Sequence, residues 1–158
     1  CGGALSLLSL HWGPNWGYAV PAEHRAFAHA AIDDGGVDLV FGHSAHHPKG
    51  IELYRGKLIV YGAGDLVNDY EGIGGHAAYR PDLGLAFVAD LRPGSGHLAG
   101  LELIPYRRRA MTLIRADAAA AGWLAEMLRR DSLLDTGGIA VTPDATLRVT
   151  PPAAPWDE

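Results

Sequence analysis

The sequence has a single cysteine, no long hydrophobic run and no extended basic stretch. With only Cys1 available, an internal disulfide and a zinc site built on several thiolates are both excluded. No stretch reaches the about 18 consecutive apolar residues that are typical of a membrane-spanning helix. The net charge is 13 − 18 = −5, and the one basic cluster is Arg107 to Arg109, which argues against nucleic acid as a general partner.

The composition that remains is that of an ordinary globular protein. The chain has 158 residues, of which 48% are hydrophobic and 20% charged, enough for one domain with a core or for part of a larger one. It opens on Cys1-Gly2-Gly3 and reaches apolar sequence at once. We expect the chain to begin within a domain, rather than at a lipidated Cys1, because a tether usually separates a lipid from a buried strand.

The most informative stretch runs from Val37 to Glu52. Its first five residues, 37–41, are mostly apolar and β-branched or aromatic, which predicts a buried strand that ends at Gly42. Three histidines follow within five residues, namely His43, His46 and His47. The predicted strand therefore delivers imidazoles to a loop at its carboxyl end, where open α/β sheets bind ligands and where imidazole is the commonest metal ligand.

A second histidine loop precedes this stretch. Residues 5–10 predict an interior strand, which ends in His11 and a loop rich in glycine and proline. Residues 22–34 predict a helix with Phe27, Ala28, Ala31 and Ile32 on one side, closed by Gly35-Gly36. Strand, helix and strand then form a βαβ unit with a parallel pair. Because parallel strands end at the same edge of a sheet, we expect His11 to lie near His43 and His46.

The remainder predicts a second group of strands and one further helix. Residues 51–54 and 57–61 read as a hairpin with Arg55-Gly56 as its turn, followed by a loop over 62–70 that is rich in glycine and carboxylates. Residues 71–82 are polar and we expect them to be mobile. The other predicted elements are an antiparallel pair (85–91, 98–106), a helix (116–130) with Trp123, Leu124, Met127 and Leu128 as its apolar stripe, and two weak strands (139–141, 147–149).

Each candidate site also has a structural interpretation. His11 could be a packed histidine beside Trp12, the triple histidine a solvated loop, and residues 62–65 a turn whose Asp65 makes a local hydrogen bond. We expect His47 to support the site rather than bind a ligand, and His24, His29, His76 and His97 to be surface residues. A phosphate loop is excluded because no Walker pattern is present, and Ser44 lacks the elbow of a serine nucleophile.

Three linked motifs resemble the CapA family, the poly-γ-glutamate capsule biosynthesis proteins that are similar to calcineurin-like metallophosphoesterases. The motifs are His11-Trp12-Gly13, Gly42-His43-Ser44-Ala45-His46 with Gly50-Ile51-Glu52, and Tyr61-Gly62-Ala63-Gly64-Asp65 with Asp69-Tyr70. They appear in order over residues 5–106. The resemblance implies an α/β (α+β sandwich) fold, the C-terminal half of a calcineurin-like metallophosphoesterase-type αββα fold. Residues 1–150 would then be the C-terminal part of a single CapA-like domain, and 151–158 a proline-rich tail.

The resemblance also implies a metal site. His11 would match the isolated histidine of the metallophosphoesterases, and His43 and His46 their histidine pair, although the spacing here is G-H-x-x-H rather than G-H-x-H. The family's aspartate and asparagine-histidine ligands belong to an N-terminal half that we do not find in this sequence. Mixed histidine and carboxylate ligands favour a divalent metal such as Mn, Fe or Zn, with two ions possible in the full domain. Asp65 and Glu52 are the candidate catalytic residues, either orienting a histidine or, for Asp65, acting as a general base.

Two functions follow from this resemblance. The first is a metal-dependent hydrolase or transferase of capsule biosynthesis, acting on an anionic polymer, poly-γ-glutamate, or on a phosphate-containing small molecule. The second is a non-catalytic cell-surface module that binds the polymer or partner proteins. By the same resemblance we expect a location in the cell envelope or outside the cell and an association with membrane-bound capsule machinery through an N-terminal part. Nucleic acid is not an expected partner.

Overall fold

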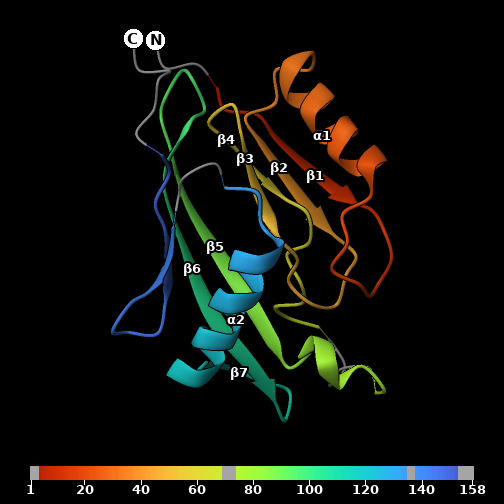
Figure 1. Cartoon of the computed structure of the whole chain (residues 1–158), viewed down its shortest axis with the longest axis vertical. Helices are drawn as coiled ribbons and strands as arrows, with labels where there is room; N and C mark the ends of the chain where they lie inside the picture. Colours follow the sequence, from red (N-terminus) through yellow and green to blue (C-terminus); the bar gives the residue numbers. More distant parts are fainter. Residues whose placement is uncertain (1–3, 69–73, 135–137, 153–158) are drawn as a thin grey trace.

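The computed structural model describes residues 4–68, 74–134 and 138–152. It shows a mixed α/β fold with two β-sheets and two α-helices, which confirms the predicted α/β sandwich class (Figure 1). Cys1, the motif residues Asp69-Tyr70 and all but the first two residues of the expected tail lie outside the described residues. Part of the glycine-rich segment is ordered as a short 3-10 helix, η1 (Ala77–Tyr79), which the sequence did not predict.

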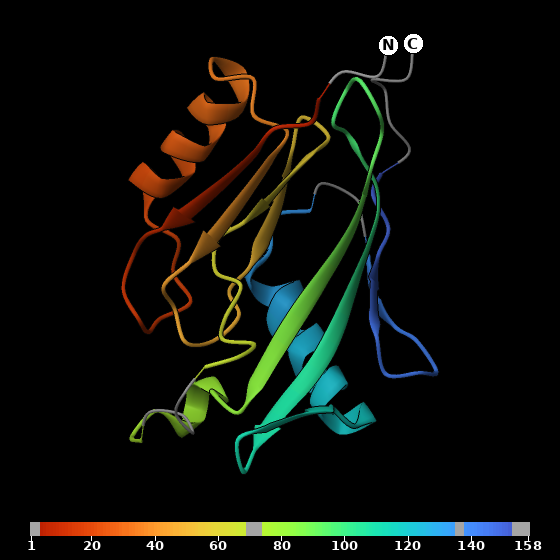
Figure 2. The same ribbon diagram turned by 180° about the vertical axis from the view of Figure 1, so that it is seen from behind.

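The first sheet contains the parallel pair that the sequence predicts. Its strands lie in the order β1-β2-β4-β3, and β2 pairs in parallel with both β1 and β4. The bounds are β1 (Leu7–His11), β2 (Leu39–His43), β3 (Ile51–Tyr54) and β4 (Lys57–Val60). Helix α1 (Ala22–Asp33) connects β1 to β2 and covers one face of this sheet (Figures 1 and 2). The predicted βαβ unit is therefore confirmed.

The prediction that the first strand is interior is wrong for the described chain. β1 lies at the edge of its sheet, and residues 7, 9 and 11 are exposed. The prediction failed because an apolar composition indicates that a strand can be buried. It does not indicate whether the strand has a neighbour on each side. Phe27 on α1 is likewise 52% exposed, although its ring contacts Trp12, whereas Ala28 and Ile32 are buried as predicted.

The hairpin of β3 and β4 agrees closely with its prediction. Arg55 and Gly56 form the two-residue turn, and both have positive φ values, 49° and 75°. Two successive positive φ values are the geometry of the primed turns that match the twist of a hairpin, and glycine adopts this conformation without a steric cost. The turn therefore sets the register that pairs Glu52 with Ile59.

The second sheet is antiparallel and larger than expected. Strands β5 and β6 agree with the predicted pair at the turn and extend beyond it at the opposite end, where β7, which was not predicted, pairs with the end of β6. The strands are β5 (Leu83–Leu91), β6 (Leu98–Arg109), β7 (Thr112–Arg115), β8 (Ile139–Val141) and β9 (Leu147–Val149). Helix α2 (Ala118–Asp131) lies between β7 and β8 in the chain. The Asp117 carboxylate caps its first turn by accepting a hydrogen bond from the Ala120 N–H at 2.8 Å.

Two hydrophobic cores lie on the two faces of the first sheet. One face packs on α1 through Val40, Ile59 and Tyr61. The other face joins the second sheet and α2 in the larger core, which includes Leu39, Val60 and Leu124 among many others. Successive residues of a strand point to opposite faces, so this division assigns a face to every residue of β1, β2, β3 and β4. Among the described helices, none is both long and apolar enough to span a membrane.

Candidate functional site at the carboxyl edge of the first sheet

His11 and His43 lie side by side at the ends of their strands. They are register partners in the β1–β2 pair, and their ring centroids are 5.5 Å apart in an edge-to-face arrangement. Neither ring is fully buried, since His11 is exposed and His43 half-buried. The structure therefore confirms that His11 lies near His43, as we inferred from parallel topology over a separation of 32 residues, whereas the placement of His46 beside them stays a prediction.

The loops that follow these two strands are joined by hydrogen bonds. The Ser44 hydroxyl donates to the Gly13 carbonyl at 3.0 Å, and the His46 N–H donates to the Asn15 carbonyl at 3.1 Å. Ser44 has a φ of 131°, a conformation that residues other than glycine rarely adopt. The contact with Gly13 helps to hold this strained turn, which separates His46 from the end of β2.

His46 is oriented by Asp65 from the third loop. The Nδ1 atom of His46 lies 2.9 Å from Oδ2 of Asp65, and each side chain is 19% exposed. Asn68 donates to the same carboxylate oxygen at 2.9 Å. If Nδ1–H of His46 donates to Asp65, the lone pair of the imidazole is on Nε2, which is the arrangement of a metal-ligating histidine with a carboxylate behind it. Asp65 therefore contacts one of the predicted metal ligands, and its role as an orienting residue or a general base stays a prediction.

Arg108, on β6 of the second sheet, holds the Asp65 loop in place. Its guanidinium donates to the carbonyls of Asp65 and Pro81, and one nitrogen lies 3.9 Å from the Asp65 carboxylate. Gly84 on β5 lies so close to the Asp65 carbonyl that a Cβ atom there would clash with it. Neither residue was predicted, and the signal for Arg108 was the arginine-rich segment after a predicted apolar strand.

His47 has a structural role, as predicted. It is fully buried, its Nε2 accepts the Gly17 N–H at 3.2 Å, and its Nδ1 lies 2.9 Å from the Pro48 carbonyl. Burial lowers the pKa of His47, although the contact with the Pro48 carbonyl opposes this effect. The Nε2 atom of His47 therefore joins the two loops, while Nδ1 contacts the next residue of its own loop.

Glu52 lies on the opposite face of the sheet from His11 and His43. Its register partner Ile59 belongs to the core under α1, as does Val40 on β2. His43 is three residues after Val40 on the same strand, so it points to the other face. The Glu52 carboxylate contacts His29 at 2.7 Å, Tyr61 at 2.5 Å and Arg25 at 3.7 Å. Glu52 thus orients a histidine, but that histidine is His29 on α1 and none of the predicted metal ligands.

Three histidines that we expected to be ordinary surface residues make defined contacts instead. His29 pairs with Glu52, His24 stacks on Trp12 with ring centroids 4.7 Å apart, and His76 stacks on Trp16 at 3.9 Å. Trp16 also lies against His46, at 5.6 Å between ring centroids. No role was predicted for this tryptophan, although an aromatic residue in a glycine- and proline-rich loop next to a candidate site is a usable signal.

The donor set fits a transition metal in chemistry but does not complete a site. His11 and His43 end two adjacent strands and His46 lies in the loop after the second, and imidazole suits Mn, Fe or Zn. Within 4–68, 74–134 and 138–152, however, no three His, Cys, Asp or Glu side chains are grouped closely enough to hold one ion. A metal at this edge would therefore need a rearrangement of these side chains or further ligands.

Comparison with known proteins addresses the identity of the chain. Residues 2–70, which include all three motifs, match the family described as "Bacterial capsule synthesis protein PGA_cap". The resemblance to the capsule synthesis family is confirmed. Two proteins named "Probable polyglutamine synthesis accessory protein", from the CDC 1551 / Oshkosh and H37Rv strains of Mycobacterium tuberculosis, are 46% identical to this chain over 151 residues. The alignment covers 96% of this chain but only 40% of either relative, so the chain spans less than half the length of these curated relatives.

Proposed function

We propose that the protein containing this chain is a metal-dependent hydrolase or transferase in the synthesis of a polyglutamate capsule, acting at the carboxyl edge of the first sheet. The observation that carries the proposal is the placement of His11 beside His43, with His46 oriented by Asp65. The substrate class is an amide-linked anionic polymer such as poly-γ-glutamate, with a phosphate ester as the other substrate to test. The family match and the names of the relatives support a role in capsule or polyglutamate synthesis.

The proposed site assigns separate roles to the residues of this chain. His11, His43 and His46 would hold the metal, and residues outside this chain would supply the remaining ligands. When bound, the metal would polarise an acyl or phosphoryl oxygen and activate a water molecule. Asp65 fixes the ring of His46 and its tautomer, while Arg108 and Asn68 fix Asp65. We place the protein in the cell envelope or outside the cell, in contact with membrane-bound capsule machinery.

A second function is favoured by two observations. The relatives are named accessory proteins, and the described part of the chain groups no three potential metal ligands. Both observations suit a module that binds the polymer or partner enzymes without catalysing a reaction. In that case the histidine cluster would be structural.

Turnover by the full-length protein distinguishes the two functions. The purified protein is loaded in turn with Mn, Fe or Zn and incubated with oligo-γ-glutamate and with a chromogenic phosphate ester. We expect the metal-loaded protein to cleave or transfer one of them and to stop when a chelator is added. If the polymer still binds after chelation and no metal gives turnover, the enzymatic function is contradicted and the binding module is supported.

A further inference from the structure

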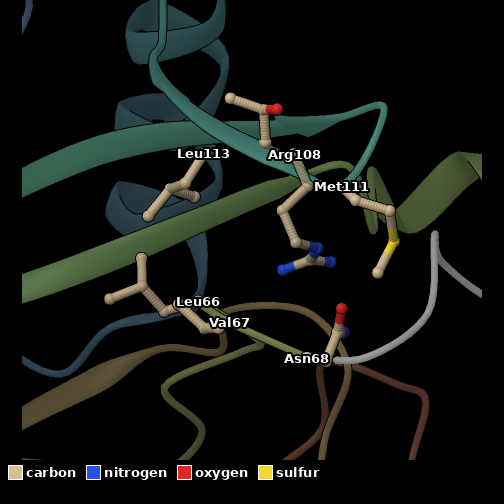
Figure 3. A pocket seen from close by; sticks show the side chains of 7 residues that line it. Leu66, Val67, Asn68, Arg108, Met111 and Leu113 are labelled. Atoms are coloured by element: carbon tan, nitrogen blue, oxygen red, sulfur yellow. The ribbon is translucent and has the colours of Figure 1, made fainter.

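A pocket lies next to Asp65, between the loop 66–68 and the hairpin of β6 and β7. It has a volume of about 40 Å³, and its lining includes Val67, Asn68, Arg108 and Met111. Figure 3 shows the guanidinium of Arg108 in the middle of these side chains, with the side-chain amide of Asn68 facing it. Both polar residues also contact Asp65, so the pocket adjoins the candidate site.

Two buried polar atoms of this pocket have no hydrogen-bond partner among the described residues. They are Nε of Arg108, an obligatory donor, and Oδ1 of Asn68, an acceptor. The Arg108 side chain is only 8% exposed, and its other nitrogens donate to the carbonyls of Asp65 and Pro81. The Asn68 amide is oriented unambiguously, because its nitrogen must face the Asp65 carboxylate. An unsatisfied buried polar atom costs free energy, so a complementary pair in one pocket points to a ligand.

The rim of the pocket is apolar and exposed. Val67 is 81% exposed and Met111 is 62% exposed, and both line the opening. Exposed apolar side chains gathered around polar groups are typical of a binding site. Arg109, which is exposed and pairs in register with the lining residue Thr112, adds a positive charge beside the rim.

We propose that this pocket binds one secondary amide of the polymer chain, together with the methylene groups beside it. The amide oxygen accepts from Nε–H of Arg108, and the amide N–H donates to Oδ1 of Asn68. The methylene groups lie on Val67 and Met111, and the free carboxylates of the polymer stay in solvent near Arg109. Because the two polar atoms are buried, the rim side chains must shift to admit the amide, and an unbranched methionine does so easily.

A neutral amide fits this pocket better than a carboxylate does. The Asp65 carboxylate already lies 3.9 Å from the Arg108 guanidinium, so a second negative charge would be repelled at short range. The pocket also offers one donor and one acceptor, which match an amide and not an acceptor-only carboxylate. The proposal rests on the proposed function for its choice of polymer, since an amide could equally come from an α-linked peptide.

Binding measurements on the full-length protein test the proposal. The probes are fluorescently labelled oligo-γ-glutamate, an α-linked oligoglutamate of equal length, and a γ-linked analogue with esters in place of amides. The double variant Val67→Ser, Met111→Ser should bind the γ-linked chain about tenfold more weakly, by loss of apolar contact. Val88→Ser is the matched control, because Val88 is an exposed valine (47%) that does not line the pocket. The ester analogue should bind about tenfold more weakly to the unaltered protein, because it cannot donate to Asn68.

The outcomes separate the pocket from the proposed function. Weaker binding of the ester analogue and of the double variant, with metal content and turnover measured alongside, supports the pocket even if no turnover is found. Equal binding of the α-linked chain also supports the amide site and assigns it to glutamyl amides of either linkage. Equal affinity of the double variant and the unaltered protein, equal affinity for ester and amide chains, or no binding of any chain would each overturn the proposal.

Discussion

Two histidine–carboxylate pairs lie on the first sheet and its loops, and they differ in their surroundings. The pair His29–Glu52 lies under α1, where Tyr61 and Arg25 also contact the carboxylate and Glu52 is 6% exposed. The pair His46–Asp65 lies at the carboxyl edge, beside the strained turn at Ser44 and a pocket, in loops that follow the strands. The distances are similar, 2.7 and 2.9 Å, so the contact alone does not identify a functional pair.

Each pair predicts a different consequence of removing its carboxylate. Glu52 joins α1 to the first sheet through His29 and Arg25, so its removal should lower the stability of the fold. Asp65 orients an imidazole at the open edge, so its loss should affect metal binding more than folding.

Replacing Glu52 with alanine should reduce the free energy of unfolding by about 3 kcal/mol, because His29, Tyr61 and Arg25 would lose their shared partner in a buried site. Burial and the hydrogen bond to Glu52 raise the pKa of Tyr61, so this phenol stays a donor that needs an acceptor. Chemical denaturation of the full-length protein measures the loss. The control Glu126→Ala, on the exposed side of α2, should change stability by less than about 0.5 kcal/mol. Loss of metal without loss of stability in Glu52→Ala would contradict the contrast.

Replacing Asp65 with asparagine should weaken metal binding by about tenfold to a hundredfold, because a carboxylate behind a ligating histidine fixes its ring and raises its basicity. Competition with a chromophoric chelator measures the affinity. Asp90→Asn, at an exposed position of β5, serves as the control and should leave metal affinity unchanged. If Asp65→Asn retains full affinity but unfolds much more easily, Asp65 belongs with Glu52 as a structural carboxylate.

The smallest effect concerns a buried charge without a carboxylate. Lys49 is 3% exposed, its Nζ donates to the Ala19 carbonyl at 2.9 Å, and no carboxylate within the described ranges forms an ion pair with it. Burial lowers the pKa of Lys49 from its ordinary 10.5, which means that the folded state disfavours the charge. We therefore expect Lys49→Met to raise the free energy of unfolding by about 1 kcal/mol at neutral pH.

The stability gain expected for Lys49→Met depends on pH. Below the lowered pKa, Lys49 is charged in both the folded and the unfolded state, so the gain in stability from Lys49→Met is complete. Above 10.5 Lys49 is neutral in both states, and the gain disappears. Denaturation curves between pH 7 and pH 11 measure it. Lys57→Met is the matched comparison and should destabilise, because Lys57 pairs with Asp38 at 2.6 Å. A loss of stability in both variants would mean that the hydrogen bond to Ala19 outweighs the cost of the buried charge.

Local patterns predicted much of this fold. The turn residues Arg55-Gly56 identified their hairpin, and the weak strands at 139–141 and 147–149 appear with the predicted bounds. Parallel topology alone brought His11 to His43. These features depend on short segments or on one connection, which a sequence specifies directly.

The missed features depend on pairing between distant segments. The face of Glu52 follows from its register with Ile59, and the edge position of β1 follows from strand order. Arg108 reaches the Asp65 carbonyl across 43 residues and from the other sheet, so no local pattern announces it. The three histidines and Asp65 were named from the sequence, whereas Asn68 and Arg108, which contact Asp65, were not.

The most direct test of the central claim is the metal content of three variants of the full-length protein. His43→Ala and His46→Ala remove histidines at the carboxyl edge, and His97→Ala removes one outside it. Elemental analysis of the purified proteins should show a large loss of metal in the first two and normal content in the third. Equal metal content in all three variants would contradict the account and would make the histidine cluster a structural feature of the loops.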